Sequence, residues 1–255
     1  MDALAVALAV ALIQVQAQFG KMGAIKKEEE QWHHGQAKSI TFIVTKDCQL
    51  ACKYCYLVGK NSKERMPYEI AKQAVDYILD NKEISETADS VVCDYIKTEM
   101  FKKNHPWFNS YRFSFSTNGI NYNTPKVQDY IKKNHSHLSI AITIDGSKKK
   151  HDLNRVYKST NRGSYNDVVK NIPLWLNEFP EVGTKVTISS ADIPYIKDSV
   201  LHLYSLGIHI VNINCVFEDI WHSGDDILYE NQLIDLANVI IDEGWYHDYY
   251  CSFFI

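Results

Sequence analysis

The stretch TKDCQLACKYCY, residues 45–56, holds three of the six cysteines of this 255-residue chain, at Cys48, Cys52 and Cys55. Disulfide bridges that close loops this small are strained, so a disulfide framework is not expected here. Thiolates are soft ligands that select zinc, copper(I) or an iron-sulfur cluster. A structural zinc site needs four protein ligands, whereas a cluster held by three cysteines leaves one iron open. The stretch therefore predicts a metal centre and favours an iron-sulfur cluster.

Segments typical of strands and of helices alternate through the rest of the chain. Apolar, β-branched segments predict strands at residues 39–45, 90–92, 112–117, 138–144, 184–188 and 208–216. Amphipathic or capped segments predict helices at residues 66–79, 94–103, 124–133, 164–180, 192–207 and 225–244. Such alternation is typical of a parallel sheet. We therefore expect an α/β fold, a partial (β/α)6 TIM-like barrel whose second βα unit is incomplete.

The place of the cysteines in this pattern predicts where a reactive centre lies. Barrels of this kind carry it at the carboxyl ends of the strands. Three polar loops follow predicted strands directly, and they begin near Cys48, Asn118 and Asp145. We expect these loops to face one another across the mouth of the barrel.

Composition limits the partners and the compartment. The net charge of −4 gives no strong field for nucleic acid or an anionic membrane, so neither is an expected partner. Clustered cysteines favour a reducing, cytoplasmic location. The apolar run at residues 3–13 is too short to span a bilayer and has no basic leader. It predicts a short packed helix or a mis-assigned start, with a signal peptide as the minor alternative.

The spacing Cys48-x3-Cys52-x2-Cys55, with Tyr54 before the third cysteine, resembles the cluster-binding motif of radical S-adenosylmethionine (radical SAM) enzymes. The resemblance implies a 4Fe-4S cluster on the three cysteines, with S-adenosyl-L-methionine on the open iron. It further implies cleavage of that cofactor to a 5′-deoxyadenosyl radical that removes a hydrogen atom from a substrate. The alternative from the residues is a zinc knuckle that borrows His33 or His34 as its fourth ligand.

The same resemblance suggests which other residues touch the cofactor. Tyr54 is expected in the adenine pocket, and polar groups after the fourth predicted strand would help to hold S-adenosylmethionine. Arg155 is a candidate partner for a carboxylate, because guanidinium groups make bidentate charge-assisted bonds. Asp145 is either a cofactor-binding residue or a helix cap. The full set of expected cofactor-binding residues is Tyr54, Ser116, Thr117, Asn118, Asp145 and Arg155.

The chain departs from the family pattern in two places. It has no Gly-Gly-Glu-Pro-like segment between Lys82 and Asp94, where the family contacts the amino group of the cofactor. It also shows no cysteine-rich carboxyl-terminal extension for auxiliary clusters. We expect residues 1–36 to form an extension or linker and residues 37–255 to form the radical SAM core domain. The remaining cysteines, Cys93, Cys215 and Cys251, are expected as core thiols.

Within the family, the chain looks most like maturases of ribosomally made, Cys-rich repeat precursor peptides. The signs are the residues around Cys48, the strand end at Asp145-Gly146, and His151-Asp152. This implies thioether crosslinking of a precursor peptide, with a flavodoxin- or ferredoxin-like electron donor as a second partner. The alternatives are oxidation of the sulfatase-maturing type and a non-catalytic, zinc-stabilised peptide-binding module.

Overall fold

The computed structural model describes residues 12–15, 42–55, 57, 62–80, 90–109, 111–217 and 220–254. The chain divides into two compact units. Unit 1 comprises Met1–Asp47, Ser62–Thr117 and Thr124–Ile140, and unit 2 comprises Cys48–Asn61, Asn118–Asn123 and Ala141–Ile255. The cysteine stretch therefore belongs mostly to unit 2. Tyr56, His33 and His34 lie outside the described residues.

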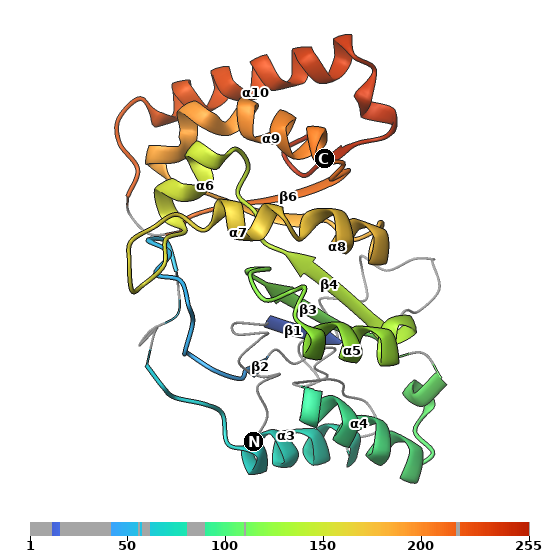
Figure 1. Cartoon of the computed structure of the whole chain (residues 1–255). Helices are drawn as coiled ribbons and strands as arrows, with labels where there is room; N and C mark the ends of the chain where they lie inside the picture. Colours follow the sequence, from blue (N-terminus) through green and yellow to red (C-terminus); the bar gives the residue numbers. More distant parts are fainter. Residues whose placement is uncertain are drawn as a thin grey trace, which may run out of the picture. The chain divides into compact units, whose positions relative to one another are not determined.

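A four-stranded sheet with the order β2-β1-β3-β4 organises unit 1 (Figure 1). Its strands are β1 (Leu12–Val15), β2 (Phe42–Ile43), β3 (Phe113–Thr117) and β4 (Leu138–Ile142). β1 runs antiparallel to both neighbours, with Leu12 opposite Ile43 on one side and Ser116 on the other. Alternate residues of β3 are buried, as expected of a strand with one face on the core. β4 continues from unit 1 into unit 2.

The helices of unit 1 pack through their apolar faces. The elements are α3 (Tyr68–Asp80), α4 (Ser90–Lys102), η1 (Pro106–Asn109), α5 (Pro125–Asn134) and η2 (His135–His137). On α4 the buried residues are Cys93, Ile96 and Met100, which follow one another at helical spacing. α5 begins at Pro125, which needs no amide partner in the first turn of a helix.

Parallel strands form the sheet of unit 2, in the order β5-β6-β7. They are β5 (Thr184–Ile188), β6 (Ile210–Cys215) and β7 (Tyr250–Cys251). A parallel bridge between Thr143 and Lys185 links the segment after β4 to β5. The buried Thr184 hydroxyl donates to the Ile142 carbonyl over 2.7 Å, which fixes this junction.

Helices cover the sheet of unit 2. They are α6 (Lys148–Asn154), α7 (Tyr165–Val169), α8 (Ile172–Glu178), η3 (Ser190–Tyr195), α9 (Ile196–Ser205), α10 (Asp225–Asp242) and η4 (Trp245–His247). η3 begins with a capping box in which Ser189 and Asp192 satisfy each other's backbone amides. α10 packs on α9 and η3, and Figure 1 shows these helices along one side of β6.

Most of the predicted elements are confirmed, and two are wrong. The expected strand at residues 90–92 is the first turn of α4, because the buried row from Cys93 to Met100 extends a helix back to Ser90. Leu12 and Ile13, expected in a helix, lie in β1, where they pair with two strands. The rest of the run at residues 3–13 lies outside the described residues.

Smaller differences concern helix boundaries and short elements. The helix expected at residues 164–180 is divided into α7 and α8, whereas α6 and β7 were not predicted. The structure is a mixed α/β fold, and the six-unit barrel itself stays a prediction. In the part of the chain that the structure describes, no helix has both the length and the apolar character needed to cross a membrane.

Candidate functional site

The cysteine loop lies in unit 2 with its first thiol enclosed. Cys48 is buried, and its Sγ accepts the Leu50 amide over 3.4 Å and the Asn118 side-chain amide over 3.9 Å. Asn118 is held in place because its Oδ1 accepts the Ile120 amide. Cys52 and Cys55 are partly exposed, and none of the three thiols is in a disulfide. The loop thus presents one enclosed sulfur and two accessible ones.

Backbone hydrogen bonds join the cysteine loop to residues 154–158. The amides of Ala51 and Lys53 donate to Val156 and Asn154 over 2.8 and 3.2 Å. Farther along, the Lys158 amide donates to the Gln49 carbonyl over 3.1 Å. This segment follows α6 directly and carries Arg155. The loop and the arginine are therefore positioned by one shared piece of backbone.

Three side chains converge beside the loop. The Tyr54 hydroxyl donates to Asp145 Oδ2, and Arg155 Nη1 donates to the same hydroxyl over 3.0 Å. Enclosure of the hydroxyl raises the pKa of Tyr54 well above its ordinary value, although Arg155 acts in the opposite direction. Tyr54 is therefore a neutral phenol that joins an anion to a cation. Among the residues that the structure describes, no partner is found for one buried donor of Arg155, its Nε.

Asp145 is a fully buried carboxylate. Its Oδ1 accepts the Thr187 amide over 3.2 Å. Burial acts to raise the pKa of Asp145, but Lys150 and Arg155 outweigh burial and hold the pKa below its ordinary value. Lys150 is itself fully buried and donates to the Thr187 carbonyl over 2.7 Å. The N-cap of α6 is Ser147, so the alternative of Asp145 as a helix cap is wrong.

A buried histidine links the Asp145 loop to the Arg155 backbone. His151 Nδ1 accepts the Asp145 amide, so Nε2 carries the proton and donates to Ser164 Oγ over 3.0 Å. Ser164 in turn donates to the Arg155 carbonyl over 2.7 Å. Burial, together with the nearby Arg155 cation, lowers the pKa of His151 to about 3. The imidazole is neutral and holds two parts of the site in register.

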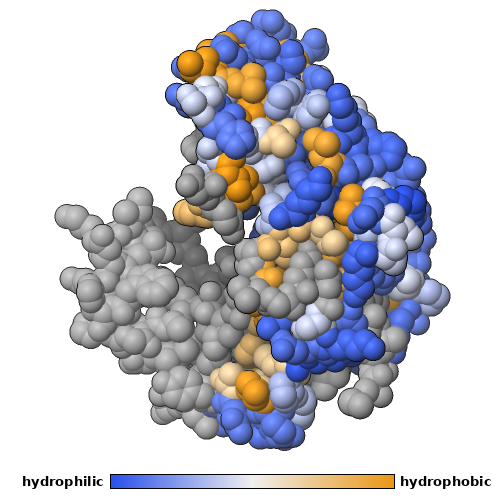
Figure 2. All heavy atoms as spheres, turned by 90° about the vertical axis from the view of Figure 1, so that its left-hand side faces the viewer, coloured by the Kyte–Doolittle hydropathy of each residue, from blue (hydrophilic) through white to orange (hydrophobic). Residues whose placement is uncertain are grey.

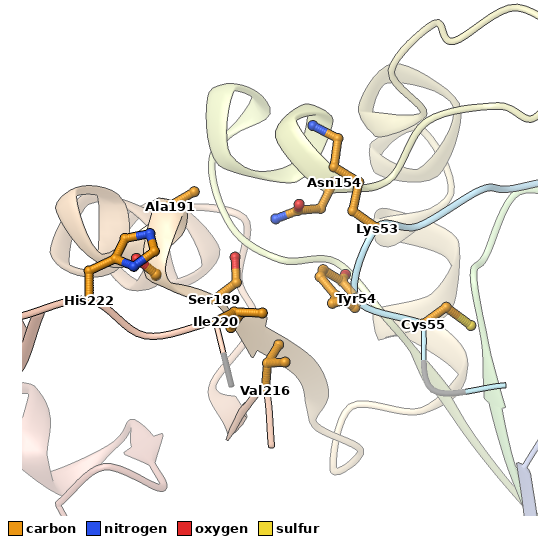
Figure 3. A pocket seen from close by; sticks show the side chains of 10 residues that line it. Lys53, Tyr54, Cys55, Asn154, Ser189, Ala191, Val216, Ile220 and His222 are labelled. Carbon is orange, nitrogen blue, oxygen red and sulfur yellow. The ribbon is translucent and has the colours of Figure 1, made fainter. Parts of the chain in front are cut away.

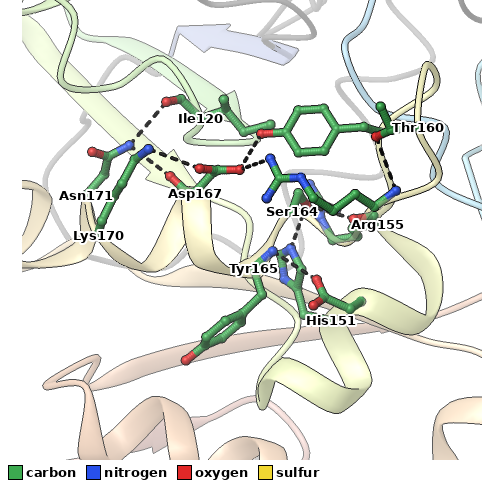
Figure 4. Close-up of polar contacts among 12 residues, drawn as sticks. Ile120, His151, Arg155, Thr160, Ser164, Tyr165, Asp167, Lys170 and Asn171 are labelled. Atoms are coloured by element: carbon green, nitrogen blue, oxygen red, sulfur yellow. Dashed lines mark hydrogen bonds and ion pairs between the residues drawn. The ribbon is translucent and has the colours of Figure 1, made fainter.

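Asp167 accepts several hydrogen bonds from residues of and near the segment that follows α6 (Figure 4). Its carboxylate accepts hydrogen bonds from the Tyr157 hydroxyl, Arg162 and Lys170 over 2.9, 2.6 and 3.1 Å. These bonds, above all that from Arg162, lower the pKa of Asp167 to about 2. Nearby, the Asn171 side chain donates to the Gly119 carbonyl over 2.7 Å. The turn after Asn118 is thereby attached to the start of α8.

A pocket of about 570 Å³ opens next to Tyr54. Its lining comes from the cysteine loop, the end of α6, the end of β5 and the loop after β6. Figure 3 shows Tyr54, Cys55 and Lys53 on one side of the pocket and His222 with Ala191 on the other. Ser189 and Val216 lie between these two groups. The volume falls within the range of about 300–1,000 Å³ typical of small-molecule sites.

The structure brings together part of the predicted site. Tyr54, Asp145 and Arg155 are in direct contact, and Asn118 contacts Cys48. Ser116 and Thr117 lie on β3 in unit 1, so their part in the site stays a prediction.

The cysteines are less fully accounted for. In the described residues, no three His, Cys, Asp or Glu side chains lie close enough together to hold a metal ion. Metal binding by Cys48, Cys52 and Cys55 therefore stays a prediction that requires their side chains to turn. Cys93 and Cys251 are buried as predicted, whereas the core position predicted for Cys215 is wrong: this thiol is exposed beside the Tyr229 hydroxyl.

Several residues of the site carry no signal that the sequence reveals. Lys150 ends a run of three lysines that is typical of a solvated surface, yet it is fully buried against β5. Ser164, the link between His151 and Arg155, was expected merely to start a helix. Ser189 and His222 line the pocket from loops that follow β5 and β6. Only their position after strand ends could have indicated them.

Comparison with known proteins identifies the fold. No protein-family model matches the chain. The uncharacterized protein MJ0907 of Methanocaldococcus jannaschii is 27% identical over 183 residues, which cover 69% of this chain and 62% of that protein. The chain thus spans about three fifths of the length of that relative.

Solved structures match a larger share of the chain than this sequence relative does. Native anSMEcpe with bound AdoMet and Cp18Cys peptide matches with a TM-score of 0.61 at 15% identity, over 79% of this chain and 59% of that chain. The same protein with AdoMet and Kp18Cys peptide matches with a TM-score of 0.59 at 14% identity, over 79% and 60%. It is an anaerobic sulfatase-maturating enzyme that uses radical SAM chemistry. The chain therefore has the fold of a radical SAM enzyme.

Proposed function

We propose that this protein is a radical SAM enzyme that modifies a ribosomally made precursor peptide, by forming a thioether between a cysteine sulfur and a carbon atom. The observation that carries the proposal is the contact of Tyr54 with Asp145 and Arg155. It connects the cysteine loop, whose thiols form no disulfide, to a buried carboxylate and a buried guanidinium beside a pocket of about 570 Å³. The fold and the cysteine spacing independently favour the same chemistry.

The donor set fits an iron-sulfur cluster. Cys48, Cys52 and Cys55 are three soft ligands on one short loop, and none is engaged in a disulfide. Cys52 and Cys55 are partly exposed, and cluster binding would require their side chains to turn toward Cys48. The hydrogen bonds from Leu50 and Asn118 would remain on Cys48 and reduce the charge that its sulfur presents. A cluster and S-adenosylmethionine, when bound, supply the radical that removes hydrogen from the substrate.

The pocket fits S-adenosylmethionine. Its lining is mostly apolar, with polar groups from Lys53, Asn154 and Ser189, a pattern typical of nucleoside-sized ligands. Arg155 has an unpartnered buried Nε, and a buried donor of this kind favours an incoming acceptor such as a carboxylate. Tyr54 separates Arg155 from Asp145 without a full charge of its own. Of these three side chains, Tyr54 lines the pocket, and Arg155 is connected to the pocket through its hydrogen bond to the Tyr54 hydroxyl.

The substrate is proposed to be a peptide. The structural relatives carry bound Cys-containing peptides, as their names state, which supports this class. Thioether formation removes two hydrogens from the peptide, one from carbon and one from sulfur. One hydrogen atom goes to the deoxyadenosyl radical, the remaining electron goes to the oxidised flavodoxin- or ferredoxin-like protein, and the proton goes to solvent. A flavodoxin- or ferredoxin-like protein in the cytoplasm is the proposed partner that supplies reducing electrons.

Oxidation of the sulfatase-maturing type is the second candidate function. It is favoured by one observation, the likeness of the fold to anSMEcpe with its peptides. Both reactions need the same cluster, cofactor and reductant. They differ in the product, since serine or cysteine oxidation creates a carbonyl group, whereas crosslinking creates a thioether and no carbonyl group.

Anaerobic reconstitution tests the shared chemistry. Purified chain is supplied with iron, sulfide and S-adenosylmethionine, then reduced with dithionite. We expect about four irons per chain and release of 5′-deoxyadenosine. Replacement of Cys48, Cys52 or Cys55 by Ala should abolish both, whereas Cys215→Ala, at an exposed thiol, should preserve both. Stoichiometric zinc without nucleoside cleavage would instead identify a zinc-stabilised peptide-binding module.

Mass spectrometry of a Cys-containing peptide distinguishes the two candidate reactions. Crosslinking predicts loss of two hydrogens together with protection of the cysteine from alkylation. Oxidation predicts a product that a hydrazide reagent labels. Cleavage of S-adenosylmethionine with neither product would support radical SAM chemistry but reject both peptide reactions.

A further inference from the structure

Helix α10 carries an exposed apolar stripe. Ile227, Ile234 and Ile241 are 61%, 51% and 63% exposed. They recur every seven residues, close to two helical turns, and so share one face of the helix. Leu236 and Ile240 face the interior instead. Figure 2 shows hydrophobic side chains exposed among hydrophilic ones at the upper end of the view, where Figure 1 places α10.

The charged residues of this helix are all acidic. Residues 225–242 contain no Lys or Arg, and their acidic members are Asp225, Asp226, Glu230, Asp235 and Asp242. Lys197 of α9 lies 3.5 Å from Asp235 and is the partner described for one of these carboxylates. Acidic residues at the start of a helix are favoured by the helix dipole, but Asp242 lies at the end, where a carboxylate is disfavoured. The stability of the helix alone therefore does not account for this distribution.

We propose that this isoleucine stripe (Ile227, Ile234 and Ile241) binds a basic amphipathic helix of a partner polypeptide. Apolar side chains of the partner, at the same seven-residue spacing, would cover the isoleucines. Its Lys and Arg residues would lie against the flanking carboxylates. A second copy of α10 suits the stripe less well, because two such helices would bring carboxylates against carboxylates and neither helix carries a Lys or Arg of its own.

Binding of a designed probe peptide tests the proposal. The probe is a fluorescent helix of about 21 residues, or three heptads, with Leu at the core positions and Lys beside them. A matched peptide carries Glu in place of Lys. Fluorescence anisotropy with the full chain should show saturable binding of the Lys peptide, weakened by salt, and no binding of the Glu peptide.

Three variants show whether the stripe itself is the site. Ile234→Ser should weaken binding at least tenfold, because it removes the central apolar contact. Ile70→Ser on α3, at a position 54% exposed, is the matched control and should bind as the unmodified chain does. Glu230→Gln should weaken binding modestly and reduce its salt dependence. Thermal unfolding should be unchanged in all three, since each replaces an exposed side chain.

Three results would overturn the proposal. The first is equal binding by the Ile234→Ser and unmodified chains, and the second is equal binding of the Lys and Glu peptides. The third is a dimer in sedimentation experiments that Ile234→Ser converts to monomer, which would assign the stripe to a second copy of the chain. None of these experiments depends on the cluster or on S-adenosylmethionine, so failure here leaves the proposed function standing.

Discussion

Arg155 Nη1 donates to the Tyr54 hydroxyl over 3.0 Å, although the two residues are 101 positions apart in sequence. Tyr54 lies between two cysteines of the loop, and Arg155 lies on the segment that pairs with the backbone of that loop. The hydroxyl in turn donates a hydrogen bond to Asp145 Oδ2. The cysteine loop is therefore held at once by its backbone and by a side chain in its middle.

Tyr54→Phe should loosen this connection. The change removes one hydroxyl and leaves Asp145 and Arg155 each short of a hydrogen-bond partner in a buried place. The expected loss is about 1–3 kcal/mol in the free energy of unfolding, with weaker binding of S-adenosylmethionine. Urea titration and equilibrium dialysis measure the two effects. Tyr246→Phe, at an exposed ring, should change neither. Full stability in Tyr54→Phe would show that the hydroxyl is not a structural link.

Asp145→Asn should be more damaging. It keeps the shape of the side chain but removes the anion that faces two buried cations, Lys150 and Arg155. Leaving buried cations without a compensating charge is expected to cost up to about 3–5 kcal/mol, the loss that follows when one side of a buried ion pair is removed.

A second substitution tests whether charge is the cause. Adding Lys150→Met to Asp145→Asn removes one of the stranded cations and should recover part of the loss. Asp198→Asn, at an exposed carboxylate, should stay within about 0.5 kcal/mol of the unmodified chain. If the double variant is as unstable as the sum of its single variants, the loss does not arise from unpaired charge.

The neutral state of His151 should make stability depend on pH. Its pKa is about 3 in the folded chain, against an ordinary value of 6.5, so the unfolded chain takes up a proton that the folded chain refuses. The contribution of His151 is complete above about pH 6.5 and is lost as the pH falls toward about 3. The slope approaches about 1.4 kcal/mol per pH unit in this window.

The difference between two variants isolates this contribution. His151→Asn retains an acceptor for the Asp145 amide but cannot be protonated, so its stability should fall less steeply with acid. His247→Asn, at an exposed position, should parallel the unmodified chain. Urea unfolding at several pH values between about 5 and about 7 measures the slopes. Identical slopes for the unmodified chain and His151→Asn would contradict the assigned pKa.

Sequence patterns predicted the carboxyl-terminal half of the fold closely and the amino-terminal half less well. Residues 184–188 are a strand with the predicted bounds, because alternation of buried residues, a preceding Gly and a following cap agree there. The strand predicted at residues 90–92 was wrong. Val91 and Val92 favour strands locally, whereas the packing of Cys93, Ile96 and Met100 imposes a helix. Tertiary contacts outweighed local preference.

Site residues could be predicted where the residue type and its place in a motif indicate a role. They were missed where the role depends on whether the side chain is buried. Tyr54 could be singled out because it lies in the cysteine motif, and Asp145 and Arg155 because they match a pattern of the family that begins at a predicted strand end. Lys150 could not, since its neighbours Lys148 and Lys149 are solvated and sequence alone does not show which lysine turns inward. The antiparallel β1 was equally hidden, because its partners are residues far along the chain.

Gly163→Ala should destabilise the protein by displacing the Asp152 side chain. A Cβ atom at Gly163 would lie 2.0 Å from the Asp152 carboxyl carbon, closer than any real contact. Asp152 must then move, and it would lose the hydrogen bond that its Oδ1 accepts from the Tyr165 amide over 2.9 Å at the start of α7. We expect a loss of about 1–3 kcal/mol in the free energy of unfolding, measured by urea titration. Asp152→Ala removes the clash, so adding Gly163→Ala to it should cost little more. Additive losses in that double variant would locate the strain in the backbone of Gly163 rather than in its contact with Asp152.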